Sequence, residues 1–87
     1  MENNKSFKIY TERMNEDKIN ELLSISFDGF TVIHTQGNWK GVKEDSIIIE
    51  IITKNETLVK AIAQAIKKFN KQEAILVTSQ NVDCELL

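Results

Sequence analysis

The chain has 87 residues, of which 41% are hydrophobic and 28% charged, and this length fits a single small domain, residues 1–87. Eleven Lys and Arg against 13 Asp and Glu give a net charge of −2, with no basic run. Nucleic acid is therefore a poor candidate partner, because phosphate recognition needs clustered Lys and Arg. A domain this small buries only roughly 60% of its unfolded surface, so an oligomer that buries more is expected.

The sequence carries no pattern typical of export or membrane insertion. Residues 1–5 are polar and do not resemble a signal peptide, and the single Cys84 cannot form an internal disulfide. The longest apolar run, residues 47–52, is interrupted by Glu50 and is too short to span a bilayer. We therefore expect a cytoplasmic protein that does not enter a membrane.

The first half of the chain predicts a strand, a helix and a second strand. Residues 7–11 alternate apolar and polar side chains, which is typical of a half-buried strand. Asn15 then precedes two acidic residues, as an N-cap does, and a helix is expected to follow. Four residues of this helix recur at helical spacing: Ile19, Leu22, Leu23 and Ser26. After a turn at residues 28–29, residues 30–35 return to β-favouring types.

The second half repeats this pattern in the order strand, helix, strand. Residues 46–53 have isoleucine on both alternating faces, which predicts a central strand. Asn55 is the predicted cap of a helix that extends to Phe69, because the apolar residues between them keep i, i+3, i+4 spacing. Residues 74–78 predict a fourth strand, and residues 84–87 could add a short edge strand.

The order βαββαβ predicts an α+β ferredoxin-like sandwich, with two helices on one face of a four-stranded antiparallel sheet. The other face of the sheet is then bare. If the odd-numbered isoleucines of residues 46–53 meet the helices, Ile48 and Ile52 flank Glu50 on the bare face. A monomer would expose this apolar surface to water, so self-association is expected.

The connection over residues 36–44 is the best candidate for a functional site. It is interpreted as a loop, because two glycines and an asparagine permit unusual backbone angles, and its Trp39 is costly to expose unless it packs on a subunit or a ligand. The alternative is a long hairpin whose Trp39 covers the edge of its own core. Glu44 is placed where the third strand begins and is either part of the site or a solvated charge. Residues 72–73, by themselves, form a plain polar connection.

Familiar catalytic and metal-binding patterns are missing from the sequence. His34 is the only histidine and no cysteine cluster accompanies it, so a metal site is not expected. A Gly-rich phosphate loop, a Ser-His-Asp set or a cysteine nucleophile elbow cannot be assembled. We expect neither a metal nor another cofactor.

The element order, with residues 28–33 before a glycine-containing loop, resembles the PII-type signalling proteins. Those proteins are trimers that bind adenine nucleotides between subunits through the loop after the second strand. The loop is shorter here, and the basic residues that hold nucleotide phosphates in that family are not evident.

A closer resemblance is to the small phage-encoded S-adenosylmethionine lyases, which are trimers on the same PII-like plan. It rests on the aromatic loop at residues 37–39, on Glu44, and on residues 70–77 followed by Ser79-Gln80. The resemblance implies a substrate site at a subunit interface, to which four residues would contribute: Trp39, Glu44, Gln72 and Glu73. It also implies cleavage of S-adenosylmethionine to homoserine lactone and methylthioadenosine.

Such a reaction suits a site with few functional groups, since the substrate's own carboxylate attacks the carbon next to sulfur. A dry pocket that folds the substrate can accelerate this step without a strong base. Under this hypothesis Glu44 is catalytic and holds the sulfonium side or the amino group, Gln72 and Glu73 fix polar groups, and Trp39 stacks on adenine or faces the cation. The alternatives are a non-catalytic PII-like module for an adenine-containing ligand or a protein partner, and an interaction protein that acts through the Trp39 loop.

Overall fold

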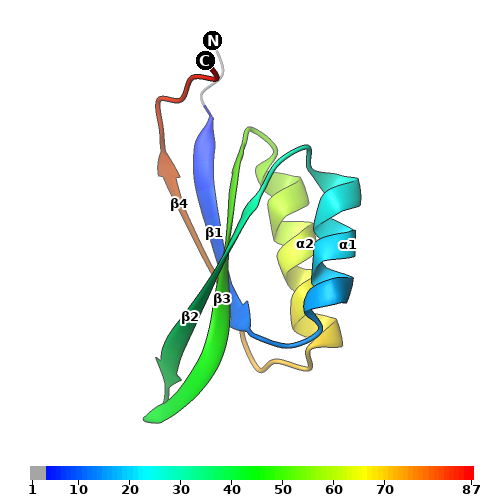
Figure 1. The fold of residues 1–87 in the computed structure, drawn as a ribbon, viewed down its shortest axis with the longest axis vertical. Helices are drawn as coiled ribbons and strands as arrows, with labels where there is room; N and C mark the ends of the chain where they lie inside the picture. The colour runs from blue at the N-terminus through cyan, green and yellow to red at the C-terminus, as the bar shows by residue number, and fades with distance from the viewer. Residues whose placement is uncertain (1–3) are drawn as a thin grey trace.

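A computed structural model describes residues 4–87 and contains four strands and two helices (Figure 1). In chain order these are β1 (Lys5–Glu12), α1 (Glu16–Ser26), β2 (Thr31–Trp39), β3 (Val42–Thr53), α2 (Glu56–Phe69) and β4 (Leu76–Asn81). The strands form one sheet in the order β2-β3-β1-β4, with every neighbouring pair antiparallel. Both helices cover the same face of the sheet (Figure 1). The predicted ferredoxin-like α+β sandwich is confirmed.

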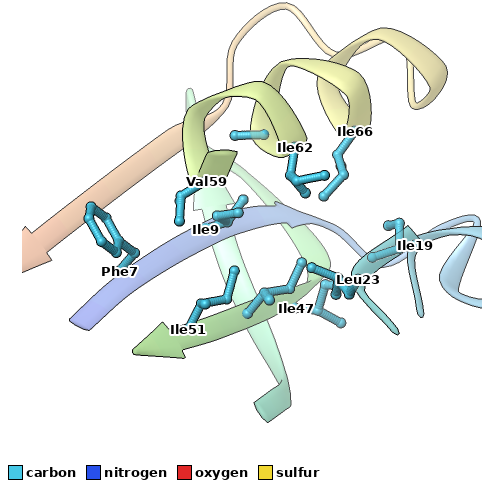
Figure 2. Close-up of a cluster of buried hydrophobic side chains, with 11 residues drawn as sticks. Phe7, Ile9, Ile19, Leu23, Ile47, Ile51, Val59, Ile62 and Ile66 are labelled. Carbon is cyan, nitrogen blue, oxygen red and sulfur yellow. The ribbon is translucent and has the colours of Figure 1, made fainter. Parts of the chain in front are cut away.

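The core lies between the sheet and the helices, as the strand alternation predicts. Ile47, Ile49 and Ile51 of β3 are at most 1% exposed and face the helices. Figure 2 shows Val59, Ile62 and other helix residues pointing toward the isoleucines and the phenylalanine of the central strands. Burying each such side chain contributes about 1.5–3 kcal/mol, and this contact is what attaches the helices to one face of the sheet.

The two asparagines predicted as helix caps behave differently. The Asn55 side-chain oxygen accepts a hydrogen bond from the backbone N–H of Leu58 at 3.0 Å, which confirms it as the cap of α2. Asn15 precedes α1 as predicted, but its side chain makes no capping bond. Its backbone is left-handed (φ 57°), whereas a capping residue is normally extended, and its amide instead donates to Asn70 Oδ1 at 2.8 Å.

The predicted loop over residues 36–44 is wrong, because this segment is a tight hairpin. β2 continues to Trp39 and β3 begins at Val42, so that only Lys40 and Gly41 form the turn. Both have positive φ, 51° and 81°, as a type I′ hairpin turn requires. Glu44 therefore lies inside β3, opposite a β2 residue, and does not open the strand.

The fourth strand begins and ends later than predicted, at Leu76–Asn81, and residues 82–87 form no further strand. After β4 the chain continues beside the residue that precedes β1, where the backbone N–H of Val82 lies 3.4 Å from the Asn4 carbonyl oxygen. No helix in the described part of the chain, residues 4–87, has the length and apolar character to cross a bilayer.

The face of the sheet away from the helices carries a band of apolar side chains that we call the apolar row. It crosses all four strands and consists of Leu76, Tyr10, Ile48 and Ile33, each aligned with the next in the strand registers. Its two ends, Leu76 and Ile33, are 58% and 45% exposed. The next row is polar and contains an ion pair between Lys8 and Glu50, 3.7 Å apart. The prediction of a bare, partly apolar face is confirmed.

Candidate functional site

A hollow of about 610 Å³ lies at one end of the open face of the sheet. The end of β1, the β2–β3 hairpin and the connection between α2 and β4 come together there (Figure 1). All four residues singled out from the sequence line this hollow: Trp39, Glu44, Gln72 and Glu73. The tertiary fold thus brings together two short segments that are more than 25 residues apart in the sequence.

Trp39 and Glu44 reach the hollow from the two strands of the hairpin. Strand alternation places both on the open face, where Trp39 pairs with Val42 and Glu44 pairs with Gly37. The Trp39 side chain does not cover the protein's own core, since the residue is 51% exposed. Its indole is thus available to pack on a ligand or on another subunit.

Gln72 is held in place by the protein itself. Its side-chain carbonyl accepts hydrogen bonds from the Thr11 hydroxyl, from Asn70 Nδ2 at 3.3 Å and from the backbone N–H of Glu12 at 3.4 Å. Its amide group donates to the backbone carbonyl of Ala74 at 3.1 Å. The side-chain carbonyl of Gln72 is therefore occupied by hydrogen bonds within the protein, and one N–H of its amide group remains available to a ligand.

The residues that hold Gln72 were missed in the sequence analysis. Thr11 and Asn70 are 3% and 4% exposed, and Asn70 Nδ2 also donates to Thr11 Oγ1 at 3.2 Å. Asn15 extends this chain of hydrogen bonds to the start of α1. A threonine in a strand and an asparagine after a helix have no distinctive sequence pattern, so only their burial and pairing reveal this role.

Glu73 makes an ion pair with a residue that sequence reasoning did not assign to the site. Lys40 Nζ lies 3.1 Å and 3.3 Å from the two carboxylate oxygens of Glu73. The same ammonium lies 5.7 Å from the centroid of the Trp39 ring. Lys40 therefore links the hairpin to the connection before β4.

Acidic side chains outnumber basic ones in the hollow. The carboxylates of Glu12, Glu44 and Glu73 line it, and Lys71 is its one basic lining residue among those that the structure describes. Such an excess of negative charge favours a cationic ligand over an anionic one.

The single histidine takes part in a different contact. His34 Nε2 lies 2.9 Å from Glu16 Oε2 on the side of the sheet that carries the helices. Within residues 4–87, no three histidine, cysteine or acidic side chains are grouped so that they could hold a metal ion.

The sequence matches no protein family model and no curated protein, but several solved structures share its fold. A phage S-adenosylmethionine lyase in complex with S-methyl-5'-thioadenosine has a TM-score of 0.76 at 18% identity, and the match covers 93% of this chain and 83% of that chain. A second match is CPII, a nitrogen regulatory PII-like protein from Thiomonas intermedia K12 bound to ADP, AMP and bicarbonate. It has a TM-score of 0.71 at 17% identity, and the match covers 97% of this chain and 94% of that chain.

A DUF3240 family protein from Shewanella baltica OS155 has a TM-score of 0.75 at 13% identity, covering 100% of this chain and 98% of that chain. The chain therefore has a PII-like fold, with phage S-adenosylmethionine lyase among its structural neighbours. At these identities the likeness concerns the fold alone, so the activity has to be argued from the hollow.

Proposed function

We propose that this chain binds S-adenosylmethionine between the subunits of a homotrimer and cleaves it to homoserine lactone and methylthioadenosine. The observation that carries the proposal is the composition of the hollow, in which the indole of Trp39 accompanies the carboxylates of Glu12, Glu44 and Glu73. S-adenosylmethionine presents a sulfonium, an ammonium and an aromatic base. Carboxylates and an indole are the groups that attract such cations and stack on such a base.

The charge of the hollow also bears on the main alternative, a non-catalytic PII-like module. The PII-like neighbour CPII is bound to ADP and AMP. The phosphates of those nucleotides need several basic side chains or a cluster of backbone N–H groups. Lys71 is the one basic residue among the described lining residues, whereas three of the lining residues are glutamates. This supports a cationic adenosine ligand rather than a nucleotide.

The proposed reaction needs no proton transfer in its bond-breaking step. An oxygen of the substrate's carboxylate attacks the carbon next to sulfur in the amino-acid chain, and the carbon–sulfur bond breaks with its electron pair going to sulfur. The products are the lactone and a neutral thioether, methylthioadenosine. The protein's task is to hold the chain in its folded, cyclising shape and to exclude water.

The proposed role of Glu44 is to bind and orient the cationic part of the substrate. Because the sulfonium loses its charge as the bond breaks, a nearby carboxylate acts mainly by binding and orienting the cationic substrate, not by stabilising charge that develops in the transition state. Glu44 lies opposite a glycine on the open face, where its carboxylate can approach the sulfonium. Loss of the Glu44 carboxylate should therefore lower kcat/KM more than it lowers kcat.

A partner subunit would supply the enclosure that the hollow lacks in one chain. Trp39 is 51% exposed and the Glu73 side chain is 71% exposed, so neither is shielded from water within the monomer. The apolar row starts at Leu76, which also lines the hollow. A second copy packed on the open face would cover both, which supports a site between subunits, as the proposed homotrimer requires.

The direct test is to incubate the purified protein with S-adenosylmethionine and to separate the products by chromatography, with a protein-free sample as the control for spontaneous cyclisation. Methylthioadenosine and homoserine lactone should form in equal amounts and faster than in the control. Intact substrate that still raises Tm would instead favour the non-catalytic module. No rise in Tm with S-adenosylmethionine, ADP or AMP would contradict both functions.

A further inference from the structure

The Lys40 ammonium contacts two residues that line the hollow. Glu73 contacts it with both carboxylate oxygens, at 3.1 and 3.3 Å, and the Trp39 ring centroid lies 5.7 Å away. Trp39 and Glu73 line the hollow, whereas Lys40 belongs to the turn at the tip of the hairpin and is not itself a lining residue. Its side chain thus reaches over from outside to two groups that face the ligand space.

A carboxylate beside an aromatic face is a recognition site for an organic cation. The cation that occupies it in this structure is a primary ammonium. The amino-acid end of S-adenosylmethionine carries the same chemical group, so the ligand's ammonium can make the contacts that Lys40 makes now. The two ammonium groups cannot occupy the position together.

We propose that Lys40 is a built-in competitor for the ligand's ammonium group, which must displace it from Glu73 and Trp39. This inference rests on the proposed function, because it assumes that the hollow takes an adenosine ligand with an amino-acid chain. It assigns the amino-acid end of that ligand to the side of the hollow where the Lys40 ammonium now lies near Trp39 and Glu73.

Displacement of the Lys40 ammonium from Glu73 and Trp39 should cost little free energy. The Lys40 and Glu73 side chains are 66% and 71% exposed, and ion pairs as exposed as this are weak. The lysine side chain is a flexible four-carbon chain, so its ammonium can move out into water. The Lys40 backbone is fixed by the type I′ turn (φ 51°), so the hairpin can keep its shape when the side chain leaves.

Competition of this kind discriminates between ligands. A ligand with an ammonium binds only to the fraction of molecules in which Lys40 has left, so its apparent affinity is lowered by that fraction. Methylthioadenosine has no amino-acid chain and does not need the position. Removal of the Lys40 ammonium should therefore strengthen the binding of the first kind of ligand and leave the second unchanged.

Calorimetric titration with S-adenosylhomocysteine and with methylthioadenosine tests this, because neither carries a sulfonium and neither can undergo the proposed cleavage. Lys40→Gln removes the ammonium, and Lys43→Gln is the matched control, since it removes the same charge from the same hairpin. Lys40→Gln should bind S-adenosylhomocysteine roughly three- to tenfold more tightly, as expected for weak exposed contacts. Methylthioadenosine should bind to it as to the wild type, and Lys43→Gln should bind both ligands as the wild type does.

The other outcomes separate the two proposals. Equal changes for both ligands, no change for either, or weaker binding of S-adenosylhomocysteine to Lys40→Gln would overturn the role of Lys40 and leave the proposed function standing. No binding of either ligand to any variant would overturn the ligand assignment itself and the competitor with it. If Lys40→Gln folds poorly, Lys40→Asn is the substitute, because an Asn-Gly pair is favoured in a type I′ turn.

Discussion

Gly37 and Glu44 are paired directly across the β2–β3 ladder, so no side chain stands opposite the Glu44 carboxylate on the open face of the sheet. The backbone of Gly37 does not have a positive φ, so its conformation does not require glycine. A Cβ atom at this position would lie 3.2 Å from Ser46 Oγ, and Ser46 also lines the hollow. The absence of a side chain at Gly37 therefore keeps space free beside Glu44.

Gly37→Val should weaken ligand binding while it leaves the fold intact. Valine favours strands, so the free energy of unfolding should change by no more than about 1 kcal/mol. The added side chain should crowd the space beside Glu44 and lower the affinity for S-adenosylhomocysteine roughly tenfold, within the usual cost of overpacking. Gly29→Val is the control, because a Cβ atom there meets nothing within 4 Å. Wild-type affinity in Gly37→Val would mean that the ligand does not approach Glu44 from this side.

Ile62→Ala should destabilise the protein strongly. Ile62 is 6% exposed and points from α2 into the core (Figure 2), and deletion of such a side chain costs about 2–5 kcal/mol. The same substitution at Ile25, which is 79% exposed on α1, should change the stability by about 0.5 kcal/mol or less. Urea unfolding of both variants measures this. Equal losses in the two variants would show that the buried face of α2 has been assigned incorrectly.

Alternation and helical spacing were sufficient to predict the fold. The parity of Ile47, Ile49 and Ile51 predicted which face of β3 meets the helices, because period 2 leaves only one consistent choice. The hairpin was mistaken for a loop because glycine and asparagine at residues 37–38 are typical of turns, while the actual turn, Lys40-Gly41, is a less distinctive pair.

Of the residues that line the hollow, Trp39 and Glu44 were singled out from the sequence itself and Gln72 and Glu73 through the family resemblance, whereas the residues that hold them in place were not found. Trp39 and Glu73 could be named as separate motifs, but the ammonium of Lys40 between them depends on how the hairpin lies against the α2–β4 connection. The bonds from Thr11 to Gln72 and from Asn70 to Thr11 join residues that are about 60 positions apart. Contacts at that separation are set by tertiary packing and leave no local pattern in the sequence.

Ile33→Glu should disrupt the proposed trimer. Ile33 ends the apolar row on the edge strand β2 and is 45% exposed in the single chain, so a carboxylate there should leave the monomer folded but be costly to bury against another copy. Light scattering should give three chain masses for the wild type and one for Ile33→Glu. The matched control is Ile25→Glu on the opposite, helical side of the protein. A wild type that is monomeric at micromolar concentration would contradict the intersubunit site.

Glu16 should contribute to stability at neutral pH and lose this contribution at low pH. Two hydrogen bonds lower the pKa of Glu16 below its ordinary value, the larger effect coming from Arg13 and the next from His34. A carboxylate with a lowered pKa in the folded state stabilises the protein above the unfolded-state pKa, and this contribution disappears as the pH falls through the folded-state pKa. The wild type should therefore be more stable than Glu16→Gln at pH 7, and the difference should shrink below about pH 4.

Urea unfolding of the two proteins at pH 7 and pH 3 measures that difference. Asp17→Asn serves as the control, because Asp17 lies in the same first turn of α1 and shares its favourable position at the helix N-terminus. A stability difference between wild type and Glu16→Gln that stays constant over this pH range would contradict the role given to Arg13 and His34.

The cleavage rate of S-adenosylmethionine by Glu44→Gln, compared with the wild type and with Glu50→Gln, tests the central claim most directly. Glu50 is the matched control, since it lies on the same face of β3 but is held by Lys8 and by Ser6 Oγ at 3.2 Å, outside the hollow. With assembly verified for each variant, Glu44→Gln should lose most of the formation of methylthioadenosine at substrate concentrations below KM, while Glu50→Gln should retain it. An active wild type together with an equally active Glu44→Gln, or a wild type no faster than the protein-free control, would contradict the account.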